Sequence, residues 1–394
     1  MENGMVQIKS NHWDIFCSVV DNYGDIGVCW RLAKQLANEY QIEVVLWVDD
    51  LASFNTIQPE VDLAATTQQL KGITVNLWRE PLPVTYIPGQ VLIEAFACQL
   101  PAEVIQQLVD LKQCGQGQPC WLNLEYLSAE AWVDDCHALP SLQANGLNKS
   151  FYFPGFSRKT GGLLCEADLF TQRDVWQADS GNRLALFAKL GIEHCLDSDR
   201  FISVFSYETA ALQALCDYWQ HSATPIRLLV PLGRSLNSFV KFFNLDNHQF
   251  CAGEHWQKGN LHLHVLPLTD QIGFDRLLWS CDVNIVRGED SFLRAQWAAK
   301  PFIWHIYPQD EDYHLVKLDA LMQRYCANLD PTAAQAWQQL SLNFNRDQQK
   351  ASVESWQHYV DAEEKLNKHA KIWPISAIDD EDLATRLVHF VKNS

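Results

Sequence analysis

Short apolar runs alternate with amphipathic segments along most of the 394-residue chain, and this alternation restricts the fold more than any other feature. Apolar runs of roughly four to eight residues predict buried strands, and apolar residues at helical spacing predict helices. In the first half we expect strands at 13–20, 43–48, 73–77 and 90–95, and helices at 26–38 and 101–111. Strands that alternate with helices are typical of parallel βαβ units.

The same alternation restarts after a turn-rich segment at 140–162, which reads as the approach to a domain boundary. The expected strands are 201–205, 226–230, 261–266, 283–286 and 302–306, and the expected helices are 209–221, 274–280 and 291–298. Residues 333–370 have a helical pattern that Pro374 is expected to interrupt, and 380–391 forms a last amphipathic helix.

A chain of this length exceeds what one hydrophobic core usually organises, so two α/β domains are expected. We place the first at 1–165, completed by the C-terminal helix 375–394, and the second at 166–374. Parallel sheets bind ligands beyond the carboxyl ends of their strands. A cleft between two such domains is therefore the natural site.

Composition excludes several classes of function. Apolar residues make up 47% and charged residues 20%, as in globular proteins. No run approaches the about 18 apolar residues of a membrane span, and the N-terminal pattern is not that of a signal peptide. The net charge of −18 argues against nucleic acid and suits either a cationic partner or general solubility.

Cysteine and histidine patterns bear on location and on metals. The twelve cysteines show no CxxC pair, so we expect reduced cysteines and a cytoplasmic location. The histidines show no HExxH or other metal-ligand spacing, so metal catalysis is disfavoured.

The first loop with candidate chemistry is DNYGDIG, between the strand at 13–20 and the following helix. Gly24 and Gly27 allow a tight bend or the close approach of a ligand. One carboxylate, Asp21 or Asp25, would face the cleft as a base while its neighbour positions the reacting group. Alternatively, Asp25 is the helix N-cap and Asp21 an ordinary turn residue. The loop is not GxGxxG, so a dinucleotide site is disfavoured.

The second loop is RGEDS, where the strand at 283–286 passes into a helix expected to begin at Ser291. Free backbone amides at a helix start bind anions, and Arg287 and the Ser291 hydroxyl would add to such a site. Alternatively, Asp290 or Ser291 only caps the helix, and Arg287 pairs with Glu289 or Asp290.

The roles of two further sets of residues stay open. The acids Asp310 and Asp312 form a DxD that could bind a divalent metal with a nucleotide-sugar, but the solvated start of the next helix explains them more simply. Phe205 and Tyr207 lie at the carboxyl end of an expected strand and could touch a ligand, although Phe205 suits the core equally well.

Several stretches together resemble the bacterial elongation factor P arginine rhamnosyltransferases. They are, in order, DNYGDIGVCWRLAKQLA, NLEYLSAEAWV, FYFPGFSRKTGGLL and RGEDSFLRAQWAAKPFIWHIYPQDEDYHLVKL. The resemblance implies a GT-B-type glycosyltransferase with two Rossmann-like domains facing each other across a cleft. It also implies inverting transfer of L-rhamnose from dTDP-β-L-rhamnose to an arginine of elongation factor P, which activates that factor for ribosomes stalled on proline runs.

The resemblance also assigns roles to residues. Asp25 matches the general base and Asp21 its essential partner, and the turn residues Asn22, Tyr23 and Gly24 are expected to contact substrate. Glu289, counted with the catalytic residues, matches a donor-site position around the sugar and diphosphate. The remaining donor-site positions are Asp290 and Ser291, with Tyr207, Gln271, Phe274, Arg287 and Tyr307 lining the nucleotide pocket.

The chemistry suits these residues. An arginine guanidinium has a pKa far above neutral and stays charged, so paired carboxylates would bind it and accept a proton as the new bond forms. Amides at the second loop, with Arg287, would stabilise the departing dTDP without a metal, and no cofactor is expected. The expected partners are elongation factor P and dTDP-rhamnose, with no nucleic acid and no membrane.

Two other functions stay open. One is a GT-B glycosyltransferase with a small-molecule or lipid-linked acceptor. The other is a non-catalytic nucleotide-sugar-binding protein that regulates a partner.

Overall fold

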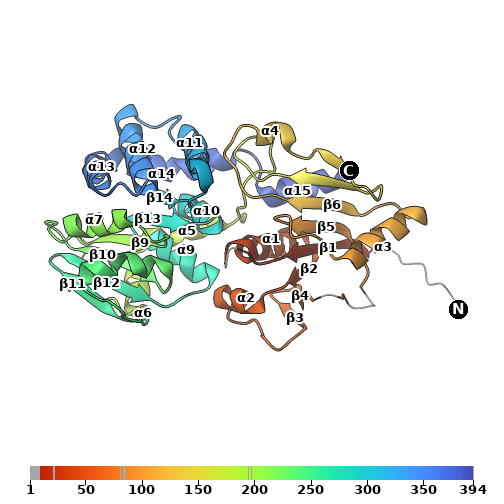
Figure 1. Ribbon diagram of the computed structural model, residues 1–394, viewed down its shortest axis with the longest axis horizontal. Coiled ribbons are helices and arrows are strands. Elements are labelled where there is room, and N and C mark those ends of the chain that lie inside the picture. Colours follow the sequence, from red (N-terminus) through yellow and green to blue (C-terminus); the bar gives the residue numbers. More distant parts are fainter. Residues whose placement is uncertain are drawn as a thin grey trace. The chain divides into compact units, whose positions relative to one another are not determined.

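The computed structural model describes residues 9–393 except 21–22, 80, 83–85, 194 and 197. Contacts divide the chain into two compact units (Figure 1). The first unit runs to Ala167 and also takes in the chain from Ala377 onwards, whereas the second spans Asp168–Ser376. Each unit contains one sheet of mainly parallel strands with helices packed on it, so the predicted α/β class is confirmed.

The sheet of the first unit has eight strands in the order β3-β4-β2-β1-β5-β6-β8-β7. The central pairs are parallel, and only the outer pairs β3/β4 and β7/β8 are antiparallel. The strands are β1 (Lys9–Cys17), β2 (Glu43–Val48), β3 (Thr67–Leu70), β4 (Ile73–Leu77), β5 (Gly89–Ala95), β6 (Cys120–Leu124), β7 (Pro140–Leu142) and β8 (Asn148–Tyr152). The strand order reverses between β1 and β5, which is where doubly wound sheets bind ligands.

The helices of the first unit are α1 (Gly24–Tyr40), α2 (Leu51–Ile57), α3 (Ala102–Gln113), α4 (Val133–Cys136) and α15 (Leu383–Lys392). The last of these returns from the end of the chain to pack beside α1. Tyr40 and Thr385 share a hydrogen bond of 2.6 Å between their hydroxyl oxygens, and the Leu383 amide donates to the Leu163 carbonyl at 2.9 Å.

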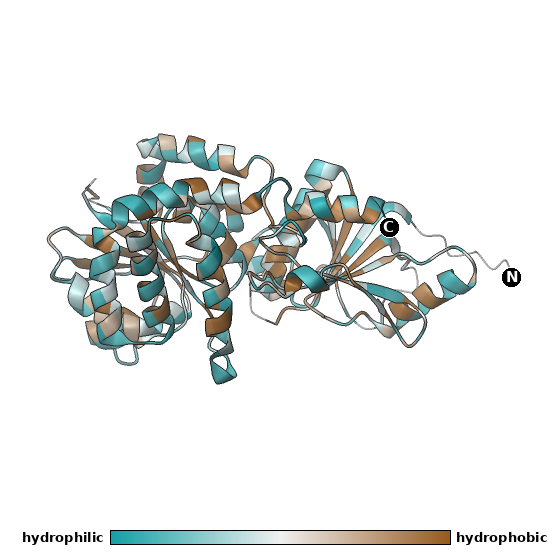
Figure 2. Cartoon of the chain, turned by 90° about the horizontal axis from the view of Figure 1, so that it is seen from above, coloured by the Kyte–Doolittle hydropathy of each residue, from teal (hydrophilic) through white to brown (hydrophobic). Residues whose placement is uncertain are grey.

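The core of the first unit explains the apolar runs in its sequence. Phe16 in β1 is fully buried and stacks on Trp47 of β2, with ring centroids 5.5 Å apart. Ile15, on the other face of the same strand, is also fully buried. A strand covered on both faces reads as a continuous hydrophobic run rather than an alternating one. In Figure 2 the strands are largely brown, whereas the surrounding helices carry both teal and brown.

The sheet of the second unit has six strands in the order β11-β12-β10-β9-β13-β14, and only β11/β12 is antiparallel. They are β9 (Arg200–Val204), β10 (Ile226–Pro231), β11 (His255–Lys258), β12 (Leu261–Leu266), β13 (Val283–Arg287) and β14 (Phe302–His305). The carboxyl ends of its five parallel strands lie along one edge, and the loops that follow them carry candidate site residues.

The α-helices of this unit are α5 (Leu169–Ala178), α6 (Ser180–Lys189), α7 (Ala210–Trp219), α8 (Val240–Phe243), α9 (Gln271–Ser280), α10 (Asp290–Trp297), α11 (Tyr313–Tyr325), α12 (Pro331–Asn345), α13 (Gln349–Asp361) and α14 (Glu363–Ile378). Two short 3₁₀ helices, η1 (Arg234–Phe239) and η2 (Asp310–Asp312), precede α8 and α11.

Some local expectations need correction. Pro374 does not interrupt a helix but lies inside α14. A proline within a helix removes one backbone hydrogen bond, and packing around it compensates here. Trp373 is buried beside it, donates from Nε1 to Gln296 Oε1 at 2.8 Å, and packs against Tyr325 with ring centroids 5.0 Å apart.

The DxD segment forms the exposed turn η2, which leads directly into α11. Within the described part of the chain, this segment does not belong to any group of side chains that could share a metal ion. The simpler of its two interpretations, the solvated start of a helix, therefore fits the structure better.

Candidate active site

One candidate site lies at the carboxyl edge of the second unit's sheet. Phe205 and Tyr207 follow β9, and Arg287 is the last residue of β13. The Arg287 guanidinium carbon lies 4.7 Å from the centroid of the Phe205 ring and 4.8 Å from that of Tyr207. A cation over aromatic faces is held by the ring quadrupoles, so the charge of Arg287 has a fixed place at this edge.

Two more predicted residues join these rings. Phe274 of α9 meets Phe205 edge to face, with centroids 5.7 Å apart. Tyr307 follows β14 and meets Tyr207 in the same way at 5.3 Å, and 58% of its surface is exposed. The structure therefore brings together Tyr207, Phe274, Arg287 and Tyr307, all predicted for the nucleotide pocket. We call them, with Phe205, the aromatic cluster.

Gln271 is buried as the first residue of α9. The preceding Asp270 caps this helix, because its Oδ1 accepts a hydrogen bond of 2.7 Å from the Gly273 amide. The cap fixes the start of α9, and so places Gln271 about one turn before Phe274.

The RGED turn connects β13 to α10 through Gly288, whose φ of 63° is in the left-handed region that favours glycine. Trp304 holds this turn by donating from Nε1 to the Gly288 carbonyl at 3.0 Å. The helix begins at Asp290, one residue earlier than expected, and Glu289 is its N-cap. Neither Asp290 nor Ser291 is therefore the N-cap of this helix.

Ser291 is buried in the first turn of α10, and its hydroxyl donates to the Arg287 carbonyl one turn back. The first-turn amides of α10 and the Arg287 charge thus lie next to each other. Such a combination of backbone N–H groups and a cation suits the phosphates of a nucleotide.

A buried ion pair fixes α9 against α10. Arg294 Nε donates to Asp275 Oδ1 at 2.9 Å, and its NH2 group donates to Oδ2 at 2.7 Å. Both side chains are almost fully buried. A paired, two-point contact of this kind has a fixed geometry, so it sets how the starts of the two helices are presented at the sheet edge.

Arg234 and Glu208 also belong to the candidate site of the second unit, although they were not predicted from the sequence. The Arg234 guanidinium carbon lies 5.6 Å from the Tyr207 ring centroid, and its NH2 group forms a 2.8 Å ion pair with Glu208 Oε2. Burial alone would raise the pKa of Glu208, but the hydrogen bonds from Arg234 lower it overall. Arg234 could have been predicted from its position, because it follows β10 at the same sheet edge.

A second candidate site lies in the first unit, around the start of α1. Asp21 and Asn22 lie outside the described residues. Tyr23 is the N-cap residue of α1, Gly24 its first residue and Asp25 its second. The helix thus begins two residues earlier than expected, and Asp25 is not its N-cap.

Asp25 is 98% buried and accepts hydrogen bonds at both of its carboxylate oxygens. The Val20 amide donates to Oδ2 at 2.9 Å, and the Tyr126 hydroxyl donates to Oδ1 at 3.1 Å. The carboxylate is therefore held in one orientation by the end of the β1 loop and by a residue from elsewhere in the sequence.

Tyr126 follows β6, in the NLEYLS stretch, and its ring stacks on Phe96 with centroids 4.5 Å apart. Phe96 begins a turn after β5 in which Phe96, Ala97 and Gln99 all have φ between 55° and 57°. The Ala97 amide donates to Asn123 Oδ1 at 3.1 Å, which secures this unusual backbone. Sequence reasoning gave Tyr126 no role, although its position after a strand end was a usable signal.

A cavity of about 330 Å³ lies at the carboxyl edge of the first unit's sheet. A larger cavity, of about 430 Å³, lies elsewhere in the protein. The smaller cavity is lined by Ser18, Asp49, Trp78, Cys98, Gln99 and Leu100. Asp49 Oδ1 accepts a 2.9 Å hydrogen bond from the Val19 amide, next to the Val20 amide that Asp25 holds. Two carboxylates thus fix the backbone between the cavity and α1.

Sheet topology and the loops at both carboxyl edges define an α/β protein of the GT-B type, as predicted. A model of the family described as Elongation-Factor P (EF-P) rhamnosyltransferase EarP matches residues 13–392. The chain belongs to this family, and the family predicted from its motifs is confirmed.

Similar proteins agree over nearly the whole chain. A protein-arginine rhamnosyltransferase of Shewanella oneidensis is 57% identical over 390 residues, which cover 98% of this chain and 99% of that protein. One from Pseudomonas putida is 45% identical over 388 residues, covering 97% and 99%. A solved structure on EarP-mediated arginine glycosylation of translation elongation factor EF-P is 33% identical, with a TM-score of 0.69 and coverage of 97% and 99%.

A more distant structure shows the fold alone. UDP-GlcNAc 2-epimerase from Neisseria meningitidis, bound to UDP-GlcNAc, is 8% identical, with a TM-score of 0.55 and coverage of 97% of this chain and all of that one. Separately, no helix in the described part of the chain is long and apolar enough to cross a membrane.

Proposed function

We propose that this chain transfers L-rhamnose from dTDP-β-L-rhamnose to an arginine side chain of elongation factor P, with inversion at the anomeric carbon and without a metal. The observation that carries the proposal is the family match over residues 13–392. The geometry of each half-site is compatible with it. Activation of elongation factor P for ribosomes stalled on proline runs would follow, and the cytoplasm would be the place of action.

The second unit would bind the donor. The rings of Tyr207, Phe274 and Tyr307 offer faces and edges to a nucleobase and sugar, while Arg287 and the first-turn amides of α10 would hold the diphosphate. As the sugar departs, negative charge grows on the dTDP oxygen. Groups that are already fixed by the fold can stabilise that charge without reorganising.

The first unit would receive the acceptor arginine. A guanidinium, whose pKa lies far above neutral, is not deprotonated in advance, so its proton must leave as the bond to the sugar forms. Asp25 is proposed as the acceptor of that proton, with Asp21 as its partner. Hydrogen bonds from the Val20 amide and the Tyr126 hydroxyl would hold the carboxylate in place for this role.

The proposed step is a single displacement. A guanidinium nitrogen attacks C1 of rhamnose, the bond from C1 to the dTDP oxygen breaks, and its electron pair leaves with dTDP. The proton from the guanidinium nitrogen passes to the Asp25 carboxylate. Because attack occurs opposite the leaving group and no covalent enzyme intermediate forms, the configuration at C1 inverts.

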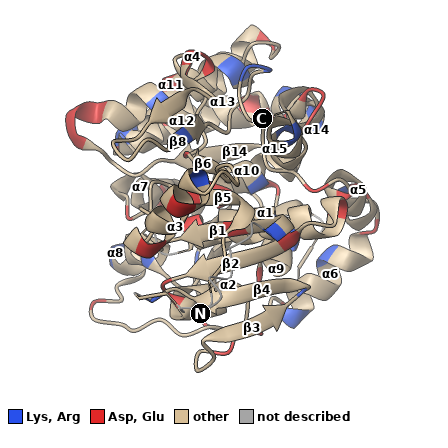
Figure 3. Cartoon of the chain, turned by 90° about the vertical axis from the view of Figure 1, so that its right-hand side faces the viewer, with Lys and Arg blue, Asp and Glu red and all other residues tan. Residues whose placement is uncertain are grey.

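Charge would assist the encounter with the protein acceptor. Acidic side chains outnumber basic ones by 48 to 30 and lie on helices and loops throughout the chain (Figure 3). A negatively charged enzyme attracts a positively charged acceptor domain over distances comparable with the Debye length. Association with elongation factor P should therefore weaken as salt concentration rises.

The test is intact-mass analysis of purified elongation factor P after incubation with this chain and dTDP-β-L-rhamnose. The expected result is the mass of one added deoxyhexose, located on one arginine. Unchanged mass despite release of dTDP would favour a different acceptor. Unchanged mass with donor binding but no release of dTDP would favour a non-catalytic binding protein. Either result contradicts the proposal.

A further inference from the structure

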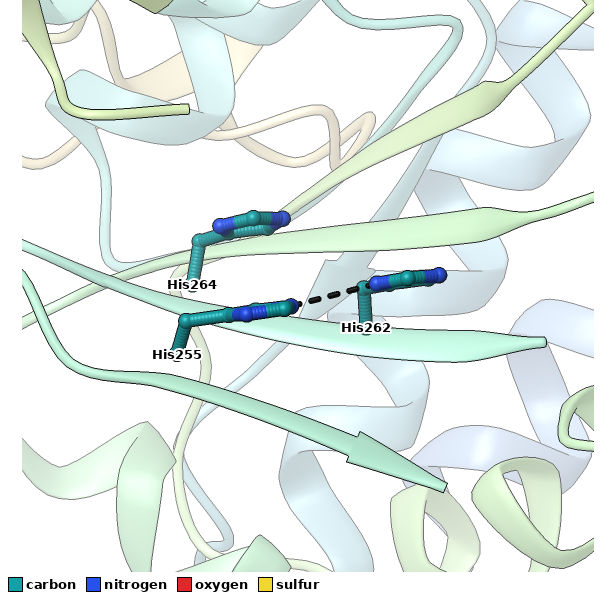
Figure 4. Close-up of side chains that lie close together, drawn as sticks. All are labelled: His255, His262 and His264. Carbon is teal, nitrogen blue, oxygen red and sulfur yellow. Dashed lines mark hydrogen bonds between the residues drawn. The ribbon is translucent and has the colours of Figure 1, made fainter. Parts of the chain in front are cut away.

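Three histidines share one face of the β11–β12 hairpin in the second unit. His262 and His264 are two residues apart in β12, so their side chains point to the same face of the strand. His255 in β11 pairs directly with His264 across the antiparallel ladder. Figure 4 shows the three rings side by side on this face.

Their nitrogen atoms lie close enough to share one ion. His255 Nε2 is 3.1 Å from His262 Nδ1, and one ring nitrogen from each residue lies within 4.8 Å of the others. Zinc binds imidazole nitrogen at about 2.0–2.1 Å, which separates two tetrahedral ligands by roughly 3.3 Å. The first pair is already at that spacing, and rotation of the rings about their broad χ2 torsions would bring in the third.

Exposure changes across the group in a way that suits a bound ion. His255 is exposed, His262 is half-buried and His264 is 95% buried, so one side is walled by protein and the other is open to water.

One neighbouring cation opposes binding. Arg227 Nη1 lies 3.4 Å from His264 Nε2. Arg227 is also held by Asp199, with 2.6 Å between Nε and Oδ2, and Asp199 is almost fully buried. The ion pair offsets the Arg227 charge and keeps the guanidinium anchored when its long contact with His264 is lost.

We propose that His255, His262 and His264 form a binding site for a first-row divalent transition-metal ion, with Zn²⁺ as the ion to test. Imidazole suits Zn²⁺, Cu²⁺ and Ni²⁺, and three protein ligands with one open position is a common zinc arrangement.

The ion would join the four-residue edge strand β11 to β12 and so stabilise the edge of the sheet. The strands β10 and β9 separate β12 from β13, which carries Arg287. The site is therefore distinct from the donor half-site and takes no part in the proposed transfer.

The experiment uses the full chain without a polyhistidine tag, stripped of metal, and measures Zn²⁺ binding by calorimetry and thermal unfolding. The wild-type chain should bind Zn²⁺ with a stoichiometry that includes one histidine-dependent site, and its Tm should rise. His255→Ala and His262→Ala should each weaken that site at least about tenfold, since even loss of an outer-shell partner often costs that much. Their Tm without metal should stay near wild type.

The matched control is His221→Ala, which removes an exposed histidine after α7 that does not belong to the group. It should bind Zn²⁺ as the wild type does. Equal affinity in the wild type, His255→Ala and His262→Ala would overturn the proposal, because any bound zinc would then be held by cysteines or other groups. Failure of the wild-type chain to bind Zn²⁺ at micromolar free metal would overturn it as well.

Discussion

The candidate site around Arg287 in the second unit and the one around Asp25 in the first unit are built differently. In the second unit, Arg287 is part of β13 itself, and the helices α9 and α10 are joined by the buried Arg294–Asp275 ion pair. In the first unit, Asp25 is held by the Val20 amide and by Tyr126, which lies 101 residues further along the chain. The packed core therefore positions the donor groups, whereas hydrogen bonds between loops position the proposed base. Changes in the first unit should affect rate, and changes in the second should affect binding or stability.

The largest expected effect is on the acceptor side. Asp25→Asn keeps the shape of the side chain but removes the proposed proton acceptor, so turnover should fall by about 10²–10⁴-fold. The measurement is the initial rate of rhamnosyl transfer to elongation factor P by intact mass. Circular dichroism should show an unchanged fold. Wild-type turnover would remove Asp25 from the mechanism.

In the second unit, the largest loss of stability is expected from breaking the buried Arg294–Asp275 ion pair. Arg294→Met leaves Asp275 buried without its guanidinium partner, and breaking a buried pair from one side typically costs about 3–5 kcal/mol in unfolding free energy. Urea unfolding measures this. The double variant Arg294→Met with Asp275→Leu removes both charges and should recover most of the loss. If the unfolding free energy does not recover, the pair stabilises the fold by more than it costs to bury its two charges.

Acid should destabilise both units, with the buried His305 contributing in the second unit and the half-buried His137 in the first. Burial lowers the pKa of His305 to about 4, and burial with the nearby Arg386 charge lowers that of His137 to about 4. As pH falls from 6.5 towards these values, the unfolded chain takes up protons that the folded chain does not. Stability present above pH 6.5 is therefore lost, by at most about 1.4 kcal/mol per pH unit for each histidine.

Urea unfolding between about pH 7 and about pH 5 tests this linkage. His305→Asn and His137→Asn should each flatten the dependence of unfolding free energy on pH compared with wild type. Variants that keep the wild-type slope would show that these two histidines do not carry the effect.

The smallest expected effect tests the hydrogen bond from Tyr126 to Asp25. Tyr126→Phe keeps the ring that stacks on Phe96 but removes the hydroxyl that donates to Asp25. Loss of one such hydrogen bond should cost about 1 kcal/mol, or roughly fivefold in turnover. If only the stack mattered, Tyr126→Phe would retain full turnover and Tyr126→Leu would lose it.

Much of the fold could be predicted because buried parallel strands have a distinct pattern. The strands at 43–48, 73–77 and 261–266 have the predicted limits, since each is a short apolar run between turns. Helix starts were less certain: α1 and α10 begin earlier than expected, because glycine and acidic residues can stand inside a first turn as well as before it. Pro374 in α14 shows tertiary packing prevailing over a local helix-breaking signal.

The donor half-site was predicted better than the acceptor half-site. The RGED motif located Arg287, a strand-end position located Tyr207, and the family resemblance located Tyr307. The structure brings the three into contact, while their roles in binding stay predictions. Tyr126 was missed because nothing local in NLEYLS indicates a partner so far away in sequence. The three histidines were missed because His255 meets His264 only once the hairpin pairs, and no linear spacing reveals that pairing.

Calorimetric titration with dTDP-β-L-rhamnose of three proteins side by side, namely wild type, Asp25→Asn and Arg287→Met, tests the division between the half-sites most directly. Asp25→Asn should bind the donor as the wild type does. Arg287→Met should bind it about tenfold or more weakly, because a charge-assisted hydrogen bond contributes about 1.5–3 kcal/mol. Wild-type affinity in Arg287→Met, or a comparable loss in Asp25→Asn, would contradict the assignment of donor binding to the second unit and of proton transfer to the first.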